Sequence, residues 1–353
     1  MSLREAVLAN LKKITDPVSG QDIVASGLVR ALNIEDDTVR FVIEIDPKQA
    51  ERMEPVRAAA EKAAAMVPGV AKVSALLTAH SEKAPPELKP KPKPSQQAPQ
   101  SIAGVDRLIA VASGKGGVGK STVSANLACA LAADGRRVGL LDADVYGPSQ
   151  PRMLGVSGRP ASPDGKTILP LKNHDVTMMS MGLMVEEGQA VVWRGPMLMG
   201  ALQQMLGQVQ WGDLDVLIVD LPPGTGDVQL TLSQKFKVDG AIVVSTPQDV
   251  ALMDARKGIN MFRQLNVPIH GMIENMSTHI CSKCGHEEHV FGHGGVAAEA
   301  EKLGVPLLGE IPLHIDIRVT SDSGTPIVVE KPDSPQAEAF RRIARNMVES
   351  GLA

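Results

Sequence analysis

The residues with the clearest chemical meaning are a glycine-rich stretch that carries two lysines, Ser113-Gly-Lys-Gly-Gly-Val-Gly-Lys-Ser-Thr122. Gly114, followed after four residues by Gly119-Lys120-Ser121, fits the Walker A pattern of phosphate-binding loops. In such a loop, backbone N–H groups and the start of the next helix hold phosphate oxygens. Lys120 is expected to reach the β- and γ-phosphates, and the Ser121 hydroxyl is expected to bind Mg²⁺. The predicted nucleotide site is therefore Gly114, Lys115, Gly116, Gly117, Val118, Gly119, Lys120, Ser121 and Thr122.

The first lysine of the loop, Lys115, adds a positive charge that an ordinary P-loop does not need. With it, the stretch resembles the deviant Walker A motif of the MinD/ParA/nitrogenase-iron-protein class of dimerising ATPases. In that class the first lysine crosses the dimer interface to the nucleotide of the partner protomer. The resemblance therefore implies ATP as the ligand, a homodimer, and a catalytic role for Lys115 alongside Lys120.

Carboxylates follow two of the apolar runs that read as strands. Asp142 and Asp144 end one run, and Asp220 ends another in the manner of a Walker B motif. Ligands of parallel α/β sheets lie beyond the carboxyl ends of the strands, so these side chains are expected to meet the P-loop. Asp220 is predicted to hold a water of the Mg²⁺ shell, and Asp144 to position the attacking water or accept its proton. Residues 222–227 are expected to form a switch loop that senses the γ-phosphate.

Asn275 follows an apolar run that is expected to end as a strand at Ile273. An amide offers one donor group and one acceptor, which matches the N6/N7 edge of adenine. We therefore expect Asn275 to contact the nucleotide base. The alternative is an asparagine that only stabilises a turn.

Cys281 and Cys284 form a CxxC motif, and His286, His289 and His293 follow it closely. Two thiolates do not complete a four-coordinate metal site. One completion is a homodimer in which two CxxC motifs supply four thiolates to one bridging cluster. Another is a zinc site within one chain, completed by the histidines. A redox dithiol is the third reading, but the thioredoxin-like context is absent. The remaining cysteine, Cys129, is expected to be a buried apolar side chain.

These candidate residues must be positioned by strands and helices, and from Asp106 onward the two alternate. The fold class that follows is α/β, a mainly parallel sheet with helices on both faces. The expected strands are 108–112, 137–141, 176–181, 215–220, 240–245, 267–273 and 305–309. The expected helices are 123–133, 197–206, 227–235, 251–265, 296–303 and 335–349.

The first 81 residues read as a separate α+β domain with the order α-β-β-α-β, namely 2–14, 28–34, 38–45, 47–66 and 70–77. A Pro- and Lys-rich linker is expected at 82–101, and the ATPase domain at 102–353. The short segments around Asp16-Pro17 and Gly27-Leu-Val29 resemble the auxiliary domain of iron–sulfur assembly factors. Residues 45–49 lack the cysteine that follows the second strand in members acting alone, so we expect a docking or regulatory role without a metal ligand. The alternative is a plain structural appendage.

Four further stretches, taken with the P-loop, are similar to the Mrp/ApbC family of iron–sulfur cluster carrier ATPases. They are Asp142-Ala-Asp-Val-Tyr-Gly-Pro-Ser-Gln-Pro151, Trp193-Arg-Gly-Pro-Met197, Asp220-Leu-Pro-Pro-Gly-Thr-Gly-Asp227 and Glu274-Asn-Met-Ser277. The resemblance covers residues from about 105 to the C-terminus. It implies an ATP- and Mg²⁺-dependent ATPase whose Lys115, Lys120, Ser121 and Asp220 serve the nucleotide and metal.

The same resemblance favours an iron–sulfur cluster, expected as [4Fe-4S], held by Cys281 and Cys284 across a homodimer. It further implies that the cluster passes to apo iron–sulfur proteins, with cluster scaffold proteins as other partners. The alternative is a partition or positioning ATPase of the ParA/MinD kind with a structural zinc site.

Composition and charge argue against nucleic acid and membranes as partners. The net charge of -4 gives no electrostatic footprint for nucleic acid, and aromatics at 2% leave few platforms for base stacking. No apolar run reaches the length of a membrane span, and the C-terminus is weakly basic for an anchor. The N-terminus lacks the apolar core of a signal peptide, so we expect a cytoplasmic protein with reduced thiols.

Overall fold

The computed structural model describes residues 2–35, 37–45, 50–79, 99–184, 195–281 and 283–353. The chain divides into two compact units, residues 1–95 and 96–353. The expected linker segment 82–98 and residues 193–194 of the Trp193–Met197 motif lie outside the described residues.

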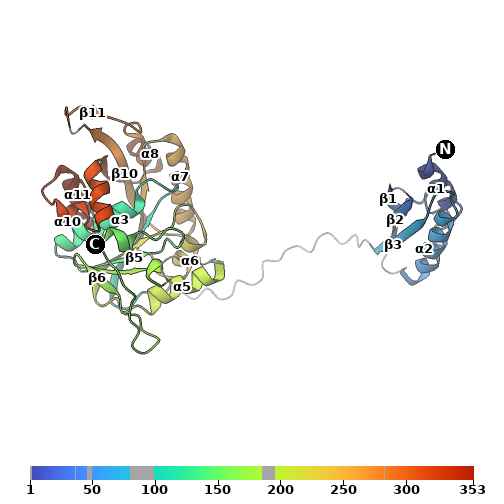
Figure 1. Ribbon diagram of the computed structural model, residues 1–353, viewed down its shortest axis with the longest axis horizontal. Coiled ribbons are helices and arrows are strands. Elements are labelled where there is room, and N and C mark those ends of the chain that lie inside the picture. Colours follow the sequence, from blue (N-terminus) through green and yellow to red (C-terminus); the bar gives the residue numbers. More distant parts are fainter. Residues whose placement is uncertain (1, 36, 46–49, 80–98, 185–194, 282) are drawn as a thin grey trace. The chain divides into compact units, whose positions relative to one another are not determined.

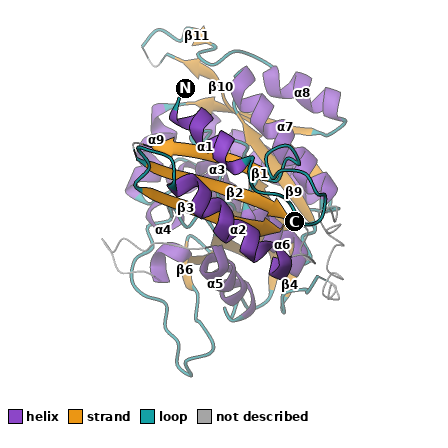
Figure 2. Ribbon diagram, turned by 90° about the vertical axis from the view of Figure 1, so that its right-hand side faces the viewer, coloured by secondary structure: helices purple, strands orange, loops and turns teal. Residues whose placement is uncertain are grey.

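The first unit has the element order expected from the sequence. Its elements are α1 (Leu3–Leu11), β1 (Val29–Glu35), β2 (Thr38–Ile45), α2 (Ala50–Ala65) and β3 (Lys72–Ala79). The central strand β2 pairs antiparallel with β1 and parallel with β3. Figure 2 shows α1 and α2 on one face of this three-stranded sheet. The helices bury Val7, Leu11, Met53 and Ala60 against Val39, Phe41 and Ile43 of β2.

The second unit alternates strands with helices. Its strands are β4 (Val105–Ala112), β5 (Val138–Asp142), β6 (Leu171–Asn173), β7 (Val176–Ser180), β8 (Leu214–Asp220), β9 (Gly240–Ser245), β10 (Ile269–Ile280), β11 (Glu287–Glu288) and β12 (Leu307–Leu313). Its helices are α3 (Lys120–Ala133), α4 (Gln150–Met153), η2 (Met181–Met184), α5 (Gly195–Gly207), α6 (Asp227–Lys235), α7 (Asp249–Gln264), α8 (Gly295–Leu303), α9 (Ile315–Ser323), α10 (Ile327–Glu330) and α11 (Pro335–Glu349). No helix in the described ranges is long and apolar enough to cross a membrane.

The strands of the second unit form one sheet with the order β11-β10-β9-β4-β8-β5-β7-β6, and β12 pairs with β10. Ladders along the middle of the sheet are parallel, whereas the edge strands β6 and β11 pair antiparallel with their neighbours. Helices cover both faces of the sheet (Figure 1). The mainly parallel α/β class predicted from the sequence is therefore confirmed.

Alternation along the central strands explains the two covering layers. In β4, Ile109 and Val111 belong to the core cluster of α3, α10 and α11, whereas Leu108 and Ala110 belong to the cluster of α5, α6 and α7. Successive side chains of a strand point to opposite faces, and here both faces are buried. Because both faces are sealed, the ends of the parallel strands are left to carry the polar residues.

Two boundaries differ from the sequence expectation. The strand expected to end at Ile273 continues to Ile280, because the left-handed Met276 (φ 58°) and a register shift after Asn275 let β10 pass an irregular point. Gln100, expected within the linker, exchanges backbone hydrogen bonds with Lys235 and Lys237 of the second unit. The exact domain limits remain a prediction.

Candidate functional site

The P-loop joins the end of β4 at Ala112 to the start of α3 at Lys120, as the sequence predicts. Its backbone is packed against neighbouring elements at two glycines. A Cβ atom on Gly114 would lie 2.1 Å from the backbone carbon of Asp254 in α7, and one on Gly119 would lie 2.1 Å from Asn275 Nδ2. Gly119 also has a left-handed φ of 82°, which other residues rarely adopt. The loop path therefore needs glycine at both positions.

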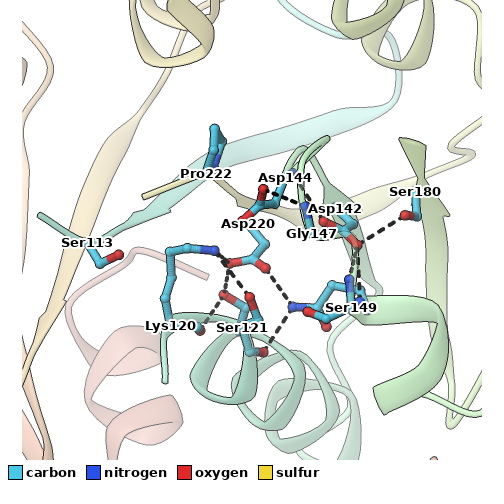
Figure 3. A network of polar contacts seen from close by, with 12 residues as sticks. Ser113, Lys120, Ser121, Asp142, Asp144, Gly147, Ser149, Ser180, Asp220 and Pro222 are labelled. Atoms are coloured by element: carbon cyan, nitrogen blue, oxygen red, sulfur yellow. Dashed lines mark hydrogen bonds and ion pairs between the residues drawn. The ribbon is translucent and has the colours of Figure 1, made fainter. Parts of the chain in front are cut away.

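Lys120 and Asp220 form a buried ion pair at the start of α3 (Figure 3). The Lys120 Nζ–Asp220 Oδ1 distance is 2.6 Å, and Lys120 Nζ lies 3.2 Å from Ser121 Oγ. Ser124 donates from its Oγ to the same Asp220 oxygen at 3.0 Å. Lysine, serine hydroxyl and Walker B carboxylate, predicted separately, thus meet at one point.

Asp142 lies opposite Asp220 on the adjacent strand β5 and is fully buried. Its carboxylate accepts N–H bonds from Asp144, Ser149 and Gln150 and an O–H bond from Ser180. Burial, and then the negative charge of Asp220, raise the pKa of Asp142, while the hydrogen bonds from Gln150, Ser180 and Asp144 oppose the rise. Asp142 therefore anchors the turn that follows β5.

Asp144 lies beside Asp142 and Asp220 (Figure 3) and is partly exposed. Its Oδ1 accepts the Gly147 N–H at 3.3 Å, so in this conformation it closes the same turn. Its role toward the attacking water stays a prediction.

The expected switch loop is hydrogen-bonded to the P-loop strand. Gly224 donates its N–H to the Ser113 carbonyl at 2.8 Å. The buried Gln229 donates from Nε2 to the carbonyls of Pro222 and Gly224, and its Oε1 accepts the Gly226 N–H. A movement of the loop near Gly224 would therefore change a hydrogen bond to Ser113, the first residue of the P-loop.

Asn275 lies within β10 and not beyond its end, and its side chain is turned toward the P-loop. Its Nδ2 donates to the Val118 carbonyl at 2.8 Å. The residue is buried, with 7% of its surface exposed. Asn275 thus supports the loop backbone in this structure, and its contact with a base stays a prediction. Lys115, by contrast, is exposed on the surface of the loop.

The CxxC motif lies at the far end of β10, in the hairpin formed with β11. His279 and Ile280 pair with Glu288 and Glu287, and the Cys281 N–H donates to the His286 carbonyl at 2.9 Å. Gly285 closes the turn by donating its N–H to the Cys281 carbonyl at 2.9 Å. Cys281 is half-buried and Cys284 is exposed, so the hairpin presents both thiols at its tip.

Cys281 and Cys129 have pKa values shifted in opposite directions. Backbone N–H groups of Lys283 and Cys284, and then the Cys284 thiol, lower the pKa of Cys281, which favours the thiolate that binds metal. Burial in α3 raises the pKa of Cys129 to about 12, as expected of an inert core residue. Within the described ranges, no three His, Cys, Asp or Glu side chains are grouped to hold a metal ion. His289 instead bonds through Nδ1 to the Ser277 carbonyl, and its ring lies against that of His293 at an angle of 39°.

The donor set around Lys120 fits Mg²⁺. It consists of the Ser121 hydroxyl, the Asp220 carboxylate and the buried Gln150 amide, whose Oε1 has no hydrogen-bond partner among the described residues. Hard oxygen donors of this kind suit Mg²⁺, which keeps several waters and few protein ligands.

Sequence reasoning missed four polar residues of the site, Ser124, Gln150, Ser180 and Gln229. A signal exists for two of them. Ser124 falls one helical turn after Lys120, and Gln150 lies within the Asp142–Pro151 stretch already singled out. The Ser180–Asp142 contact joins residues 38 positions apart and depends on packing, whereas Gln229 bonds to the loop that directly precedes its own helix.

Comparisons with known proteins agree on the class of both units. Residues 104–348 match the family model described as NUBPL iron-transfer P-loop NTPase, and residues 4–75 match that of an iron-sulfur cluster assembly protein. The chain is 44% identical over 352 residues to the iron-sulfur cluster carrier protein of Synechocystis sp., covering 98% of this chain and 97% of that one.

Two further likenesses cover 70% and 67% of this chain. The chain is 54% identical over 248 residues to the iron-sulfur cluster carrier protein of Haemophilus influenzae, covering 70% of this chain and about two thirds (67%) of that protein. Among solved structures, it resembles a nucleotide-binding protein from Archaeoglobus fulgidus in complex with ADP, with a TM-score of 0.58 and 38% identity. That likeness covers 67% of this chain and 92% of the other.

Proposed function

Because the chain belongs to the family of iron-transfer P-loop NTPases, we propose that it binds and hydrolyses ATP and carries an iron–sulfur cluster to apo-proteins. The cluster, of the [4Fe-4S] type, is cargo held by Cys281 and Cys284 of two protomers at the axis of a homodimer. Relatives named as iron-sulfur cluster carrier proteins support this reading.

One observation carries the cluster half of the proposal. The hairpin tip brings together two accessible thiols, one of them with a lowered pKa, without a third ligand among the described residues. Such a pair is half of a four-thiolate site. A second copy of the chain, related by a two-fold axis, supplies the other half with the same two residues. A zinc site built within one chain has less support, because no group of three or more His, Cys, Asp or Glu side chains is assembled among the described residues.

The nucleotide half rests on the buried cluster around Lys120. Lys120 and the P-loop N–H groups bind the phosphates, while Ser121 and Asp220 hold Mg²⁺, which screens the charge that develops on the phosphates. Asp144 orients the attacking water. Lys115, exposed on the loop, acts on the nucleotide of the partner protomer. The carboxylate of Asp220 takes part only when a phosphate draws Lys120 away from it, since the two now form an ion pair.

The first unit matches an iron-sulfur cluster assembly family and is proposed to dock client or scaffold proteins. Val18, Met66 and Leu76 are exposed apolar side chains on it, at 50%, 78% and 63%. Nucleic acid and membrane are not among the proposed partners, given the net charge of -4. The cytoplasmic location expected from the sequence remains a prediction.

The test of the carrier proposal is anaerobic reconstitution with iron and sulfide, followed by transfer to an apo iron–sulfur protein. We expect a brown holo-protein that restores the apo-protein. Cys281→Ala or Cys284→Ala should abolish stable cluster binding, because each removes two of four ligands. Cys129→Ala is the matched control, since that thiol is buried in α3, and it should bind the cluster normally. Equal cluster binding by all three variants would rule out the CxxC site.

A further inference from the structure

Gln150 lies outside the Walker A and Walker B motifs, but its side chain contacts both of them. Its Nε2 donates to the Ser121 carbonyl and to Asp220 Oδ2, both at 2.9 Å. Its backbone N–H donates to Asp142 Oδ2 at 3.1 Å. The residue is fully buried. One side chain therefore ties the start of α3 to the end of β8, and its backbone ties both to β5.

The other end of the same amide is left without a partner. Gln150 Oε1 is buried and has no hydrogen-bond partner among the described residues. A buried acceptor without a donor costs about 1–3 kcal/mol, so such atoms are uncommon in folded proteins. Gln229, another fully buried glutamine, shows the usual case, because its Oε1 accepts the Gly226 N–H and its Nε2 donates twice.

Turning the amide over does not solve the problem. A flipped Gln150 would direct its oxygen at the Asp220 carboxylate and the Ser121 carbonyl, which are both acceptors. The hydrogen-bond network therefore fixes the orientation, and the free oxygen faces away from these two groups. The partner of this oxygen is therefore a donor other than a described residue of the chain, and a water bound with the nucleotide and its metal can supply it.

We infer that Gln150 is a positioning residue for the metal–nucleotide complex, whose Oε1 accepts a hydrogen bond from a water of the Mg²⁺ shell. This inference rests on the proposed binding of Mg²⁺ with the nucleotide. Mg²⁺ keeps several of its waters when bound to proteins and phosphates, and these waters are donors. The two groups that Gln150 holds, Ser121 and Asp220, are the ones proposed to hold that metal. Gln150 then acts from both ends, fixing the protein ligands and receiving the water.

The test measures how much Mg²⁺ tightens ADP binding, by titration calorimetry of the full chain with Mg²⁺ and with EDTA. Gln150→Leu should reduce the Mg²⁺-dependent gain in affinity by roughly threefold to tenfold, the effect of one hydrogen bond. Asn126→Leu is the matched control. Asn126, which lies on α3, is likewise a fully buried amide. Its Nδ2 donates at 2.9 Å to the carbonyl of Thr122, the residue that follows Ser121. The control should lower the melting temperature without changing the Mg²⁺ gain.

Gln150→Glu separates positioning from mere packing. It keeps the acceptor oxygen but places a second carboxylate beside Asp220, so Mg²⁺ is needed more. We expect its Mg²⁺ gain to exceed that of the wild type. A role in packing alone would leave the Mg²⁺ gain of both Gln150 variants unchanged, and this would overturn the inference. Should the leucine variant fold poorly by circular dichroism, the glutamate variant decides, and a gain no greater than that of the wild type overturns the inference.

The wild-type measurement separates this inference from the function on which it rests. If Mg²⁺ does not tighten ADP binding to the wild type, the proposed metal role fails and the inference fails with it. If Mg²⁺ tightens binding to the wild type and to Gln150→Leu by the same factor, only the inference fails.

Discussion

Lys120 Nζ lies 2.6 Å from Asp220 Oδ1, so the P-loop lysine and the Walker B carboxylate form an ion pair across the end of the sheet. Both side chains are buried, with 6% and 0% of their surface exposed. In this conformation each of the two buried charges is therefore neutralised by the other. A nucleotide phosphate must compete with Asp220 for the lysine, which links phosphate binding to release of the carboxylate.

This pairing predicts different costs for stability and for catalysis. Lys120→Ala should lower ATP hydrolysis by at least about 100-fold, because it removes the charge that stabilises the transferring phosphate. It should also destabilise the fold by about 3–5 kcal/mol, since Asp220 is left buried without a counter-charge. The double variant Lys120→Ala/Asp220→Asn should recover stability but not hydrolysis. Thermal unfolding and phosphate release measure the two effects, and normal turnover in Lys120→Ala would refute the P-loop assignment.

The two glycines that begin the loop differ in what surrounds them. Gly114→Ala places a Cβ atom 2.1 Å from the Asp254 backbone, whereas at Gly116 the nearest atom would be Pro223 Cγ at 3.8 Å. Overpacking of 1–3 kcal/mol should lower the melting temperature of Gly114→Ala by roughly 2–10 °C. Gly116→Ala, the matched control, should stay within about 2 °C of the wild type. Equal melting temperatures would show that the loop does not press on α7 as described.

The proposed action of Lys115 across the dimer predicts complementation between inactive chains. Lys115→Ala and Lys120→Ala should each be inactive as pure homodimers. Mixed one to one after subunit exchange, they should regain about a quarter of the wild-type rate, because half the dimers are mixed and each mixed dimer has one complete site. No recovery in a mixture shown to contain heterodimers would place Lys115 in its own protomer's site.

Glu274 predicts a pH dependence of stability. It is fully buried in β10, where its Oε2 accepts the Val296 N–H at the start of α8. Burial raises the pKa of Glu274, and the nearby Glu310 adds to the rise while His293 opposes it. The unfolded chain thus releases this proton at lower pH than the folded one, and the stability that the neutral form provides is lost as pH rises above the unfolded value of 4.5.

Glu274→Gln should therefore melt at a higher temperature than the wild type at pH 7.5, with the difference shrinking toward pH 5. The glutamine oxygen can still accept the Val296 N–H, so the helix start is kept. Melting curves between pH 5 and pH 8 check this. A difference that does not vary with pH would mean that Glu274 is charged throughout that range.

The sequence was sufficient to locate residues whose position follows from local pattern. Asp142 and Asp220 end apolar strands, and parallel pairing then sets them opposite each other. Contacts between distant segments were not accessible in this way. Gln150 is 70 residues from Asp220, and Asn275 is 157 residues from Val118, so only packing brings each pair together. The continuation of β10 to Ile280 depends on the left-handed backbone conformation of Met276, which cannot be predicted from the residue types around it.

The carrier proposal depends most on how many chains share one cluster. The deciding measurement is iron, acid-labile sulfide and zinc per chain after anaerobic reconstitution, together with the mass of the same sample by light scattering. A [4Fe-4S] cluster held by Cys281 and Cys284 of two chains predicts about two iron and two sulfide per chain, a dimer mass, and a weaker dimer after chelation of iron. One zinc per chain, with no acid-labile sulfide, would contradict the account.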